Sequence, residues 1–258
     1  MKLYLKYISI HLRCAMQYKA SFFLTLIGQV LTSFTAFLSM YYLFERFSSI
    51  EGFTFSQVLL CFAVILLSFS LSECFARGFD LFPNMIGNGE FDRILIRPKN
   101  EIFQILASKM EFTRLGRVIQ AICIFCYAIP HSEVIWTFDK ILTLIFMIIG
   151  GFLVFSGIFI LYAVLCFFTL EGLEFMNILT NGAMEYGKYP FSIYGKQILK
   201  FLTYIVPLAL VQYYPFLYLI GHSQNHFYIF LPLIASLFLI PCFLLWKFGV
   251  KHYQSTGS

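Results

Sequence analysis

The sequence predicts an all-α membrane protein with six transmembrane helices and both termini in the cytoplasm. Of its 258 residues, 60% are hydrophobic and only 12% are charged, whereas a soluble domain carries about 25% charged residues. Apolar stretches recur along the whole chain, and a helix needs about 20 apolar residues to cross a bilayer. The Lys and Arg residues concentrate in alternate connections between these stretches, which is the pattern that orients a membrane protein.

Residues 1–20 combine basic side chains with an apolar set. Part of the apolar set recurs at i, i+3 or i+4, which predicts an amphipathic helix lying on the membrane surface. An ordinary basic flank of the first transmembrane helix accounts for the same residues equally well. The basic residues of this segment are Lys2, Lys6, Arg13 and Lys19.

Six apolar segments follow and make one membrane domain that covers residues 1–258. The third segment is the shortest, and we expect Arg114 and Arg117 at its start to reach to the interface. The fifth contains Pro207, which removes a backbone hydrogen bond and bends a helix. The predicted transmembrane helices are residues 21–44, 55–75, 113–130, 141–170, 198–219 and 227–246.

This arrangement of spans separates the basic residues strongly. With a cytoplasmic N-terminus, all of the 18 Lys and Arg residues except Arg46 and Lys140 lie on the cytoplasmic side, as the positive-inside rule requires. The two longest connections, 77–112 and 171–197, are then cytoplasmic as well. No basic run is interleaved with aromatic residues, so we expect no nucleic-acid partner.

The connection after the second span contains a short predicted helix within residues 84–98. Gly87 and Gly89 mark a tight turn before it, and Pro98 ends it after about two turns. Glu90 and Asp92 favour the start of a helix, because acidic groups suit the positive end of its dipole. The apolar face consists of Phe91, Ile94 and Leu95, and the charged face of Glu90, Arg93 and Arg97. Such a helix is suited to docking in a groove of a partner protein, although a helix resting on the lipid interface fits the pattern equally well.

The run from Gly89 to Pro98, GEFDRILIRP, resembles the G-x-[LF]-D-x-x-L-x-R-P signature of a family of bacterial type-2 ABC exporter permeases. Residues 107–117, 189–194 and 205–215 resemble further stretches of the same family. The resemblance implies a permease in the bacterial inner membrane that pairs with itself or a related permease, and with two ATP-binding cassette ATPase subunits. It also implies that the loop helix couples to the ATPase through Glu90, Phe91, Asp92, Arg93, Ile94, Leu95 and Arg97.

We expect no cofactor and no metal in this chain, because ATP and magnesium would belong to the partner ATPase. Residues 182–189 match the glycines and the lysine of a phosphate-binding loop. Tyr189, however, stands where a Ser or Thr should hold magnesium, and a predicted transmembrane helix rather than a strand precedes the run. A connector interrupted by glycines is the better interpretation.

Polar residues of the second and fifth spans are candidates for lining a translocation path. Glu73 lies one turn before Arg77, so an i, i+4 ion pair at the interface is the favoured interpretation, and a polar point on the path is the alternative. Pro207 matters because broken helices near the membrane centre often line substrate paths. The candidate path residues are Ser68, Ser72, Glu73, Tyr204, Pro207 and Gln212. The apolar character of the chain and the resemblance together suggest a hydrophobic or amphipathic cargo, such as a drug, a lipid or a peptide.

Two other functions remain as alternatives at this point. An ion-coupled secondary transporter needs an ionisable residue in the membrane, and Glu73 is the main candidate. A membrane-embedded lipid-modifying enzyme needs clustered acidic or histidine side chains, and the chain offers only Glu171, Glu174 and Glu185, with no histidine nearby.

Overall fold

The structure is a computed structural model that describes residues 2–169 and 176–255. Throughout this described part the chain forms α-helices and short 3-10 helices and no strand, which confirms the predicted all-α class. Among the described residues, five helices are long and apolar enough to cross a membrane, and a bent pair of helices becomes a sixth if it counts as one span.

The five long candidates overlap the predicted spans, with small differences at their ends. The third, whose start is the hardest to place from sequence, begins with a short 3-10 helix that ends at Arg114. The last is assembled from two helices in close succession. These spans are α2 (Lys19–Arg46), α3 (Phe55–Ala76), η1 (Phe112–Arg114) with α7 (Leu115–His131), α8 (Phe138–Thr169), and α14 (Leu231–Ser236) with α15 (Leu239–His252).

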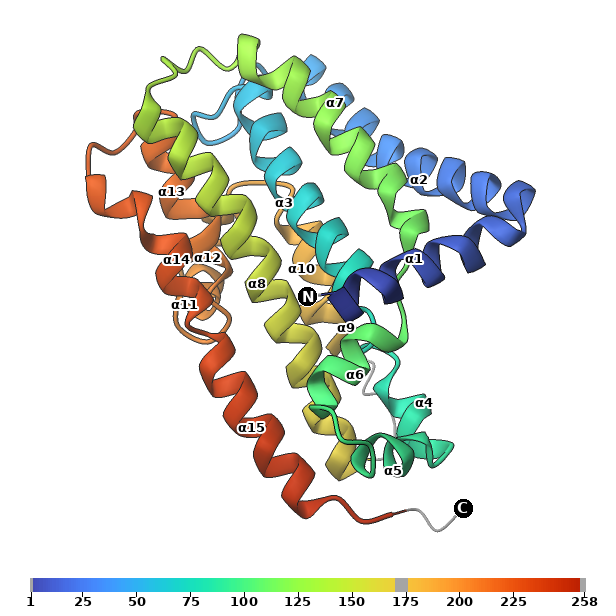
Figure 1. The fold of residues 1–258 in the computed structure, drawn as a ribbon. Coiled ribbons are helices and arrows are strands. Elements are labelled where there is room, and N and C mark those ends of the chain that lie inside the picture. Colours follow the sequence, from blue (N-terminus) through green and yellow to red (C-terminus); the bar gives the residue numbers. More distant parts are fainter. Residues whose placement is uncertain (1, 170–175, 256–258) are drawn as a thin grey trace.

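Helix α3 lies at the centre of the bundle, between α7 and α8 (Figure 1). In its most apolar stretch 83% of the residues are buried, against 6% in α2, which lies at the rim. The apolar residues of α3 cover its whole circumference, as expected of a helix that is surrounded by others. Gly151 of α8 allows a close approach of α8 to α3, because an added Cβ there would lie 2.6 Å from Oγ of Ser68. Small residues at such crossings let membrane helices pack closely.

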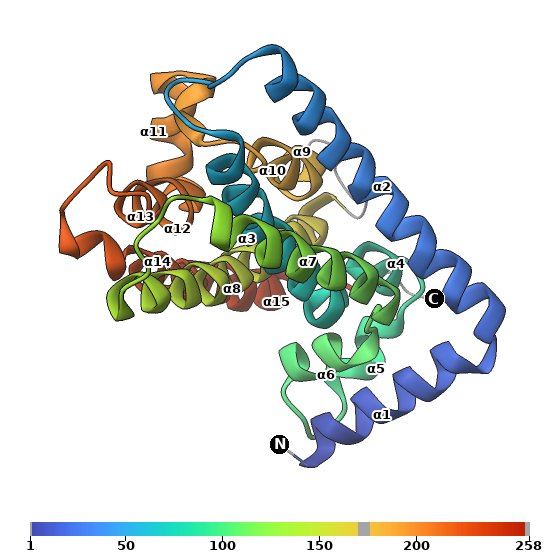
Figure 2. The same cartoon turned by 90° about the horizontal axis from the view of Figure 1, so that it is seen from above.

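The N-terminal helix α1 (Lys2–Gln17) turns sharply away from α2 (Figure 2). It is attached to α6 (Glu101–Ser108): a ring nitrogen of His11 lies 2.8 Å from the carbonyl oxygen of Ala107. The rings of Tyr4 and Tyr7 also pack against Phe103 of α6. The predicted helix is therefore present, and its position on a membrane surface stays a prediction.

The connection after α3 folds into three short helices at one end of the bundle, namely α4 (Phe82–Gly87), α5 (Glu90–Leu95) and α6 (Figure 1). The C-terminal end of α15 reaches the same end, where the ring of Tyr253 packs on Phe91. Because α1 contacts α6, both described ends of the chain lie on this side. The connections from α2 to α3 and from α7 to α8 lie at the opposite end.

The predicted fifth span is not one helix. It consists of α11 (Lys196–Tyr204), α12 (Leu208–Val211) and α13 (Tyr213–Leu219), and the chain bends by 86° between α11 and the other two. Pro207 lies at the break with φ −73° and ψ 43°, outside the helical region. The break lies at the residue where the sequence indicates a bend, because proline has no amide hydrogen to continue the helix.

The connection from 171 to 197 was predicted to lie in the cytoplasm, but part of it packs among the spans. An added Cβ at Gly187 would lie only 2.9 Å from Cγ1 of Ile65, which is near the middle of α3. Its described part has apolar residues such as Met184 and Phe191 to bury, which charge counting does not detect. The segment contains α9 (Met176–Leu179), α10 (Asn181–Tyr186) and η2 (Phe191–Tyr194). Glu171 and Glu174 lie outside the described residues.

Candidate functional site

Local sequence signals set the shape of the connection that carries the predicted coupling helix. Gly89 adopts a left-handed conformation, with φ 66°, between α4 and α5, which glycine does without steric cost. Glu90 and Asp92 occupy the first turn of α5, where the helix dipole favours negative charge. Asn100 then caps α6 by accepting a hydrogen bond from the amide of Phe103 at 3.2 Å. Within residues 84–98 this turn separates α4 from α5, which begins where the sequence places the start of the short helix.

The apolar face of α5 points into the protein. Phe91 is fully buried, and its ring packs edge-on against Phe82, Phe167 and Trp246, at centroid distances of 4.9, 5.5 and 6.2 Å. Ile94 is 8% exposed. The sequence interpretation that this face docks in a partner is therefore corrected for Phe91 and Ile94, because both are buried within the chain, where Phe91 packs on α8 and α15.

The rest of α5 and the turn after it are presented outward. Leu95 and Ile96 are 42% and 84% exposed, and Arg93 and Arg97 are exposed beside them. Asp92 is half-buried and accepts a hydrogen bond from the Ser255 hydroxyl at 2.7 Å. The surface available to a partner is thus a mixed patch, consisting of Glu90, Arg93, Leu95, Ile96 and Arg97, which we call the loop patch.

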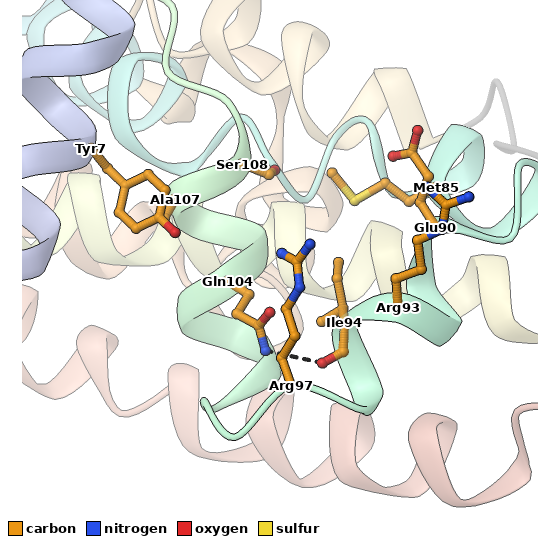
Figure 3. A pocket seen from close by; sticks show the side chains of 9 residues that line it. All are labelled: Tyr7, Met85, Glu90, Arg93, Ile94, Arg97, Gln104, Ala107 and Ser108. Atoms are coloured by element: carbon orange, nitrogen blue, oxygen red, sulfur yellow. Dashed lines mark hydrogen bonds between the residues drawn. The ribbon is translucent and has the colours of Figure 1, made fainter.

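A cavity of about 230 Å³ opens between the loop patch, α6 and α1 (Figure 3). The side chain of Arg97 extends into it, between those of Gln104 and Ile94 (Figure 3). Gln104 holds the turn in place, because its Nε2 donates to the carbonyl oxygens of Ile94 and Lys99 at 3.0 and 2.9 Å. In the described part of the chain, neither Arg93 nor Arg97 forms an ion pair. Their charges are free to meet a partner.

A second feature, the Glu73 cluster, lies where α3 meets η1 and α7. The Glu73 carboxylate is 1% exposed and is surrounded by three guanidinium groups. Arg77 binds Oε1 from one turn further along, Arg114 lies 3.3 Å from the same oxygen, and Arg117 lies 2.8 Å from Oε2. A buried charge needs such partners to offset the cost of removing it from water.

The cluster extends to further elements through its arginines. Arg114 donates to Oε1 of Gln29 on α2 at 2.8 Å and to Oε2 of Glu111 at 3.1 Å. Nε of Arg77 lies 3.0 Å from the Asp80 carboxylate. Burial raises the pKa of the Glu111 carboxyl, but the Arg77 and Arg114 guanidiniums outweigh this effect and lower its pKa overall. The cluster therefore ties α2, α3 and α7 together at the end that carries the loop.

The predicted pair of Glu73 and Arg77 is present, together with two arginines that the sequence interpretation assigned to the interface. Residues that are distant in sequence supply these contacts, so no local spacing signals them. Ser68 and Ser72 do not meet Glu73. Their hydroxyls donate to the α8 carbonyl oxygens of Ile148 and Phe152, at 3.3 and 2.7 Å, and so fasten α3 to α8.

The candidate path residues of the fifth segment are separated by its break. Tyr204 is 83% exposed at the end of α11, whereas Gln212 is fully buried. The Gln212 amide donates to the carbonyl oxygen of Gly187 at 2.6 Å and also contacts the sulfur of Cys61. Gln212 thus holds the part of the chain from α9 to η2, here called the inserted segment, against α3. Only Tyr204 among these residues faces outward.

The sequence model of the ABC-2 family transporter protein matches residues 30–257 of this chain. The chain belongs to the ABC-2 transporter family. The match begins within α2 and covers every later candidate span, the loop patch and Glu73 with its three arginines, so this ABC-2 protein is an ABC-type permease of a membrane transporter. Such permeases are transport subunits that associate with ABC ATPase subunits. No curated protein and no solved structure matches the chain.

The ABC-2 chain contains one anchor that the sequence interpretation missed. Trp246 is fully buried and contacts Phe79, Phe82, Phe91 and Phe167. Its sequence position at the end of an apolar segment predicts an interfacial aromatic residue, and only the fold shows that the loop packs over it. An added Cβ at Gly249 would lie 2.5 Å from the Phe167 ring, so the glycine allows α15 and α8 to meet below this cluster.

Proposed function

We propose that this ABC-2 protein is the permease subunit of an ATP-driven exporter and that the loop patch receives a separate ATPase subunit. The proposal rests on the loop patch, which is a charged and exposed surface on α5, a helix that is firmly anchored to the spans. The anchor and the surface occupy opposite sides of α5. A force applied to the loop patch would therefore reach the membrane helices.

Two routes lead from the loop to the spans. The first is aromatic and runs from Phe91 to Phe167 of α8 and Trp246 of α15. The second runs through α6, because Gly78 approaches it so closely that an added Cβ would lie 1.9 Å from the Ile105 carbonyl oxygen. Gly78 directly follows Arg77, a member of the Glu73 cluster, so this route continues to α2, α3 and α7. Closely packed contacts shift as units rather than deform.

The proposed topology has six crossings with both termini in the cytoplasm, where ATP is available. Phe167 of α8 and Trp246 of α15 both lie at the loop end of the bundle. The chain between them must therefore return to the opposite end, and Phe216 of α13 packs there against Phe53, just before α3. The inserted segment and α11 to α13 together make this crossing. The host membrane is proposed to be the bacterial inner membrane.

We further propose that two permeases, identical or related, enclose the path for a hydrophobic or amphipathic cargo. Within one chain the polar groups of the spans are mostly engaged: Ser72 with α8, Gln212 with Gly187 and Glu73 with arginines. Helix α2, by contrast, leaves most of its surface exposed. A path bordered by a second permease agrees with both observations.

A charge reversal in the loop patch tests the proposed coupling. Tagged permease purified from its own cells should carry an ATPase subunit, identified by mass spectrometry, and ATP hydrolysis. Arg97→Glu should lower the recovered ATPase about tenfold or more, because a charge that faces an interface is inverted. Arg46→Glu is the matched control, since Arg46 is exposed at the opposite end. Recovery of the same amount of ATPase with both variants would contradict the proposed docking site.

A further inference from the structure

Helix α11 lies across the direction of the spans, at about the middle of their length. The 86° bend separates its axis from that of α12 and α13, which continue the fifth crossing. An added Cβ on Gly151, near the middle of α8, would lie 3.4 Å from Cγ1 of Val211 on α12. Only three residues join α11 to α12, so the end of α11 lies at nearly the same depth. Figure 1 shows α11 between the levels of the two ends of α8.

Two positive charges, Lys196 and Lys200, lie on this helix at that depth, whereas the charge count placed them on the cytoplasmic side. Lys196 and Lys200 are one turn apart, so they share a face, and both are exposed. Neither forms an ion pair in the described part of the chain, and the nearby Glu185 carboxylate pairs with Lys188 instead. The centre of a bilayer is about 15 Å from either surface, beyond the reach of a lysine side chain. Charged residues at such depth face a water-filled cavity or a path for ions or substrates rather than lipid.

The other side of α11 borders an apolar cavity of about 230 Å³. Ile198, Phe201 and Leu202 of α11 line it, and the inserted segment contributes the opposite wall with Ile178, Ala183 and Tyr186. A cavity of this size and character suits part of an alkyl chain, whose burial is favoured by about 0.8 kcal/mol for each CH₂.

The lysine face and the cavity are connected along the surface of α11. At 100° per residue, the exposed positions form one continuous arc from Lys196 and Lys200, through Gln197 and Tyr204, to Phe201 and Ile198. The two ends of this arc are cationic and apolar. A single molecule lying across it can place an acidic group at the lysines and an alkyl chain at the mouth of the cavity.

We propose that α11 selects an anionic amphiphile as the cargo of this permease, with its acidic group at Lys196 and Lys200 and its alkyl chain in the adjoining cavity. This inference rests on the proposed function and specifies its cargo class. Two charges of the same sign on the path favour anions through Coulomb attraction, which is strong where water is scarce. They disfavour a cation with the same alkyl chain.

Binding by the whole permease tests the proposal directly. The protein, in phosphatidylcholine nanodiscs, is photolabelled with diazirine palmitic acid, and the labelled peptides are mapped by mass spectrometry. We expect labelling of peptides that contain residues 178–202, with palmitate competing better than hexadecyltrimethylammonium or hexadecanol. Lys196→Gln with Lys200→Gln should lower the labelling about tenfold, because each lysine contributes several-fold. Labelling that hexadecanol displaces as well as palmitate would overturn the anionic preference.

Two further variants protect the test against misfolding and unspecific charge effects. Lys196→Glu with Lys200→Glu should reverse the preference in favour of hexadecyltrimethylammonium, a gain that an unfolded protein cannot show. Lys247→Gln with Lys251→Gln removes two exposed lysines at the same spacing on α15 and should leave labelling unchanged. Unchanged labelling of the Lys196 and Lys200 variants, with normal ATPase recovery, would refute this inference alone. If no ATPase subunit copurified with the wild-type permease, that result would instead refute the proposed function.

Discussion

At the scale of single residues, Glu73 has the most demanding environment in the described chain. Its carboxylate is almost completely buried, and three arginines neutralise it. An ion-coupled transporter needs an acidic group that can exchange its ion or proton, but this carboxylate is held by fixed positive charges on α3, η1 and α7. The cluster therefore favours a structural role in joining spans over a role in ion exchange.

Removing the Glu73 charge should destabilise the protein strongly. Glu73→Gln would leave three partly buried guanidiniums without their counter-charge, and breaking a buried pair on one side costs about 3–5 kcal/mol. For a chain of this size that corresponds to a fall in melting temperature on the order of 10 °C. Thermal unfolding of the detergent-purified protein measures it.

A control for this substitution is Glu45→Gln, at an exposed position near the end of α2 that forms no ion pair in the described residues. It should change the free energy of unfolding by less than about 0.5 kcal/mol. Equal melting temperatures for the two variants would show that the Glu73 cluster does not stabilise the fold.

Among the elements, α5 has two proposed functions, anchoring the loop to the spans and docking a partner, and the sequence pattern does not distinguish them. Apolar residues at helical spacing predict one apolar face, and the helix has this face. The pattern alone does not say whether that face meets a partner or the protein itself. Burial separates the two, because Phe91 is enclosed whereas Ile96 is open.

Substitutions on the two sides of this loop should separate stability from docking. Phe91→Ala should cost about 3–5 kcal/mol, as expected for an enclosed phenylalanine, and should uncouple ATP hydrolysis from transport by loosening α5. Ile96→Ala should leave the melting temperature unchanged while it lowers ATPase recovery. Melting curves and ATPase recovery from the same preparations measure both effects. If Ile96→Ala were the more destabilising of the two, the assigned orientation of α5 would be wrong.

For the whole molecule, the break in the fifth crossing makes the number of long helices smaller than the proposed number of membrane crossings. Five helices in the described ranges are long enough by themselves to cross a membrane, and a five-span chain would place its termini on opposite sides. Phe216 packs on Phe53 at the end opposite the loop, so the chain crosses the bundle before α14. Tyr253 packs on Phe91 at the loop end, so the chain crosses it again and ends on the side where it began. The break in the helix therefore leaves the proposed number of crossings unchanged.

Cysteine labelling in intact cells checks this topology. With the exposed Cys14, Cys123 and Cys126 replaced by serine, an impermeant maleimide should label Glu51→Cys and Gln224→Cys from outside. Lys99→Cys should react only after the membrane is opened. External labelling of Lys99→Cys, or protection of Gln224→Cys, would contradict six crossings with cytoplasmic termini.

Long apolar runs and basic connections are local features, and they were enough to predict the membrane class, the helical fold and the approximate position of five spans. They also marked the loop that contains α5. The buried side of α5, the contacts of Arg114 and Arg117 with Glu73, and the packing of the segment before α11 among the spans follow from the folded arrangement alone. These features depend on residues brought together from distant parts of the chain, and neither hydropathy nor local spacing records such contacts.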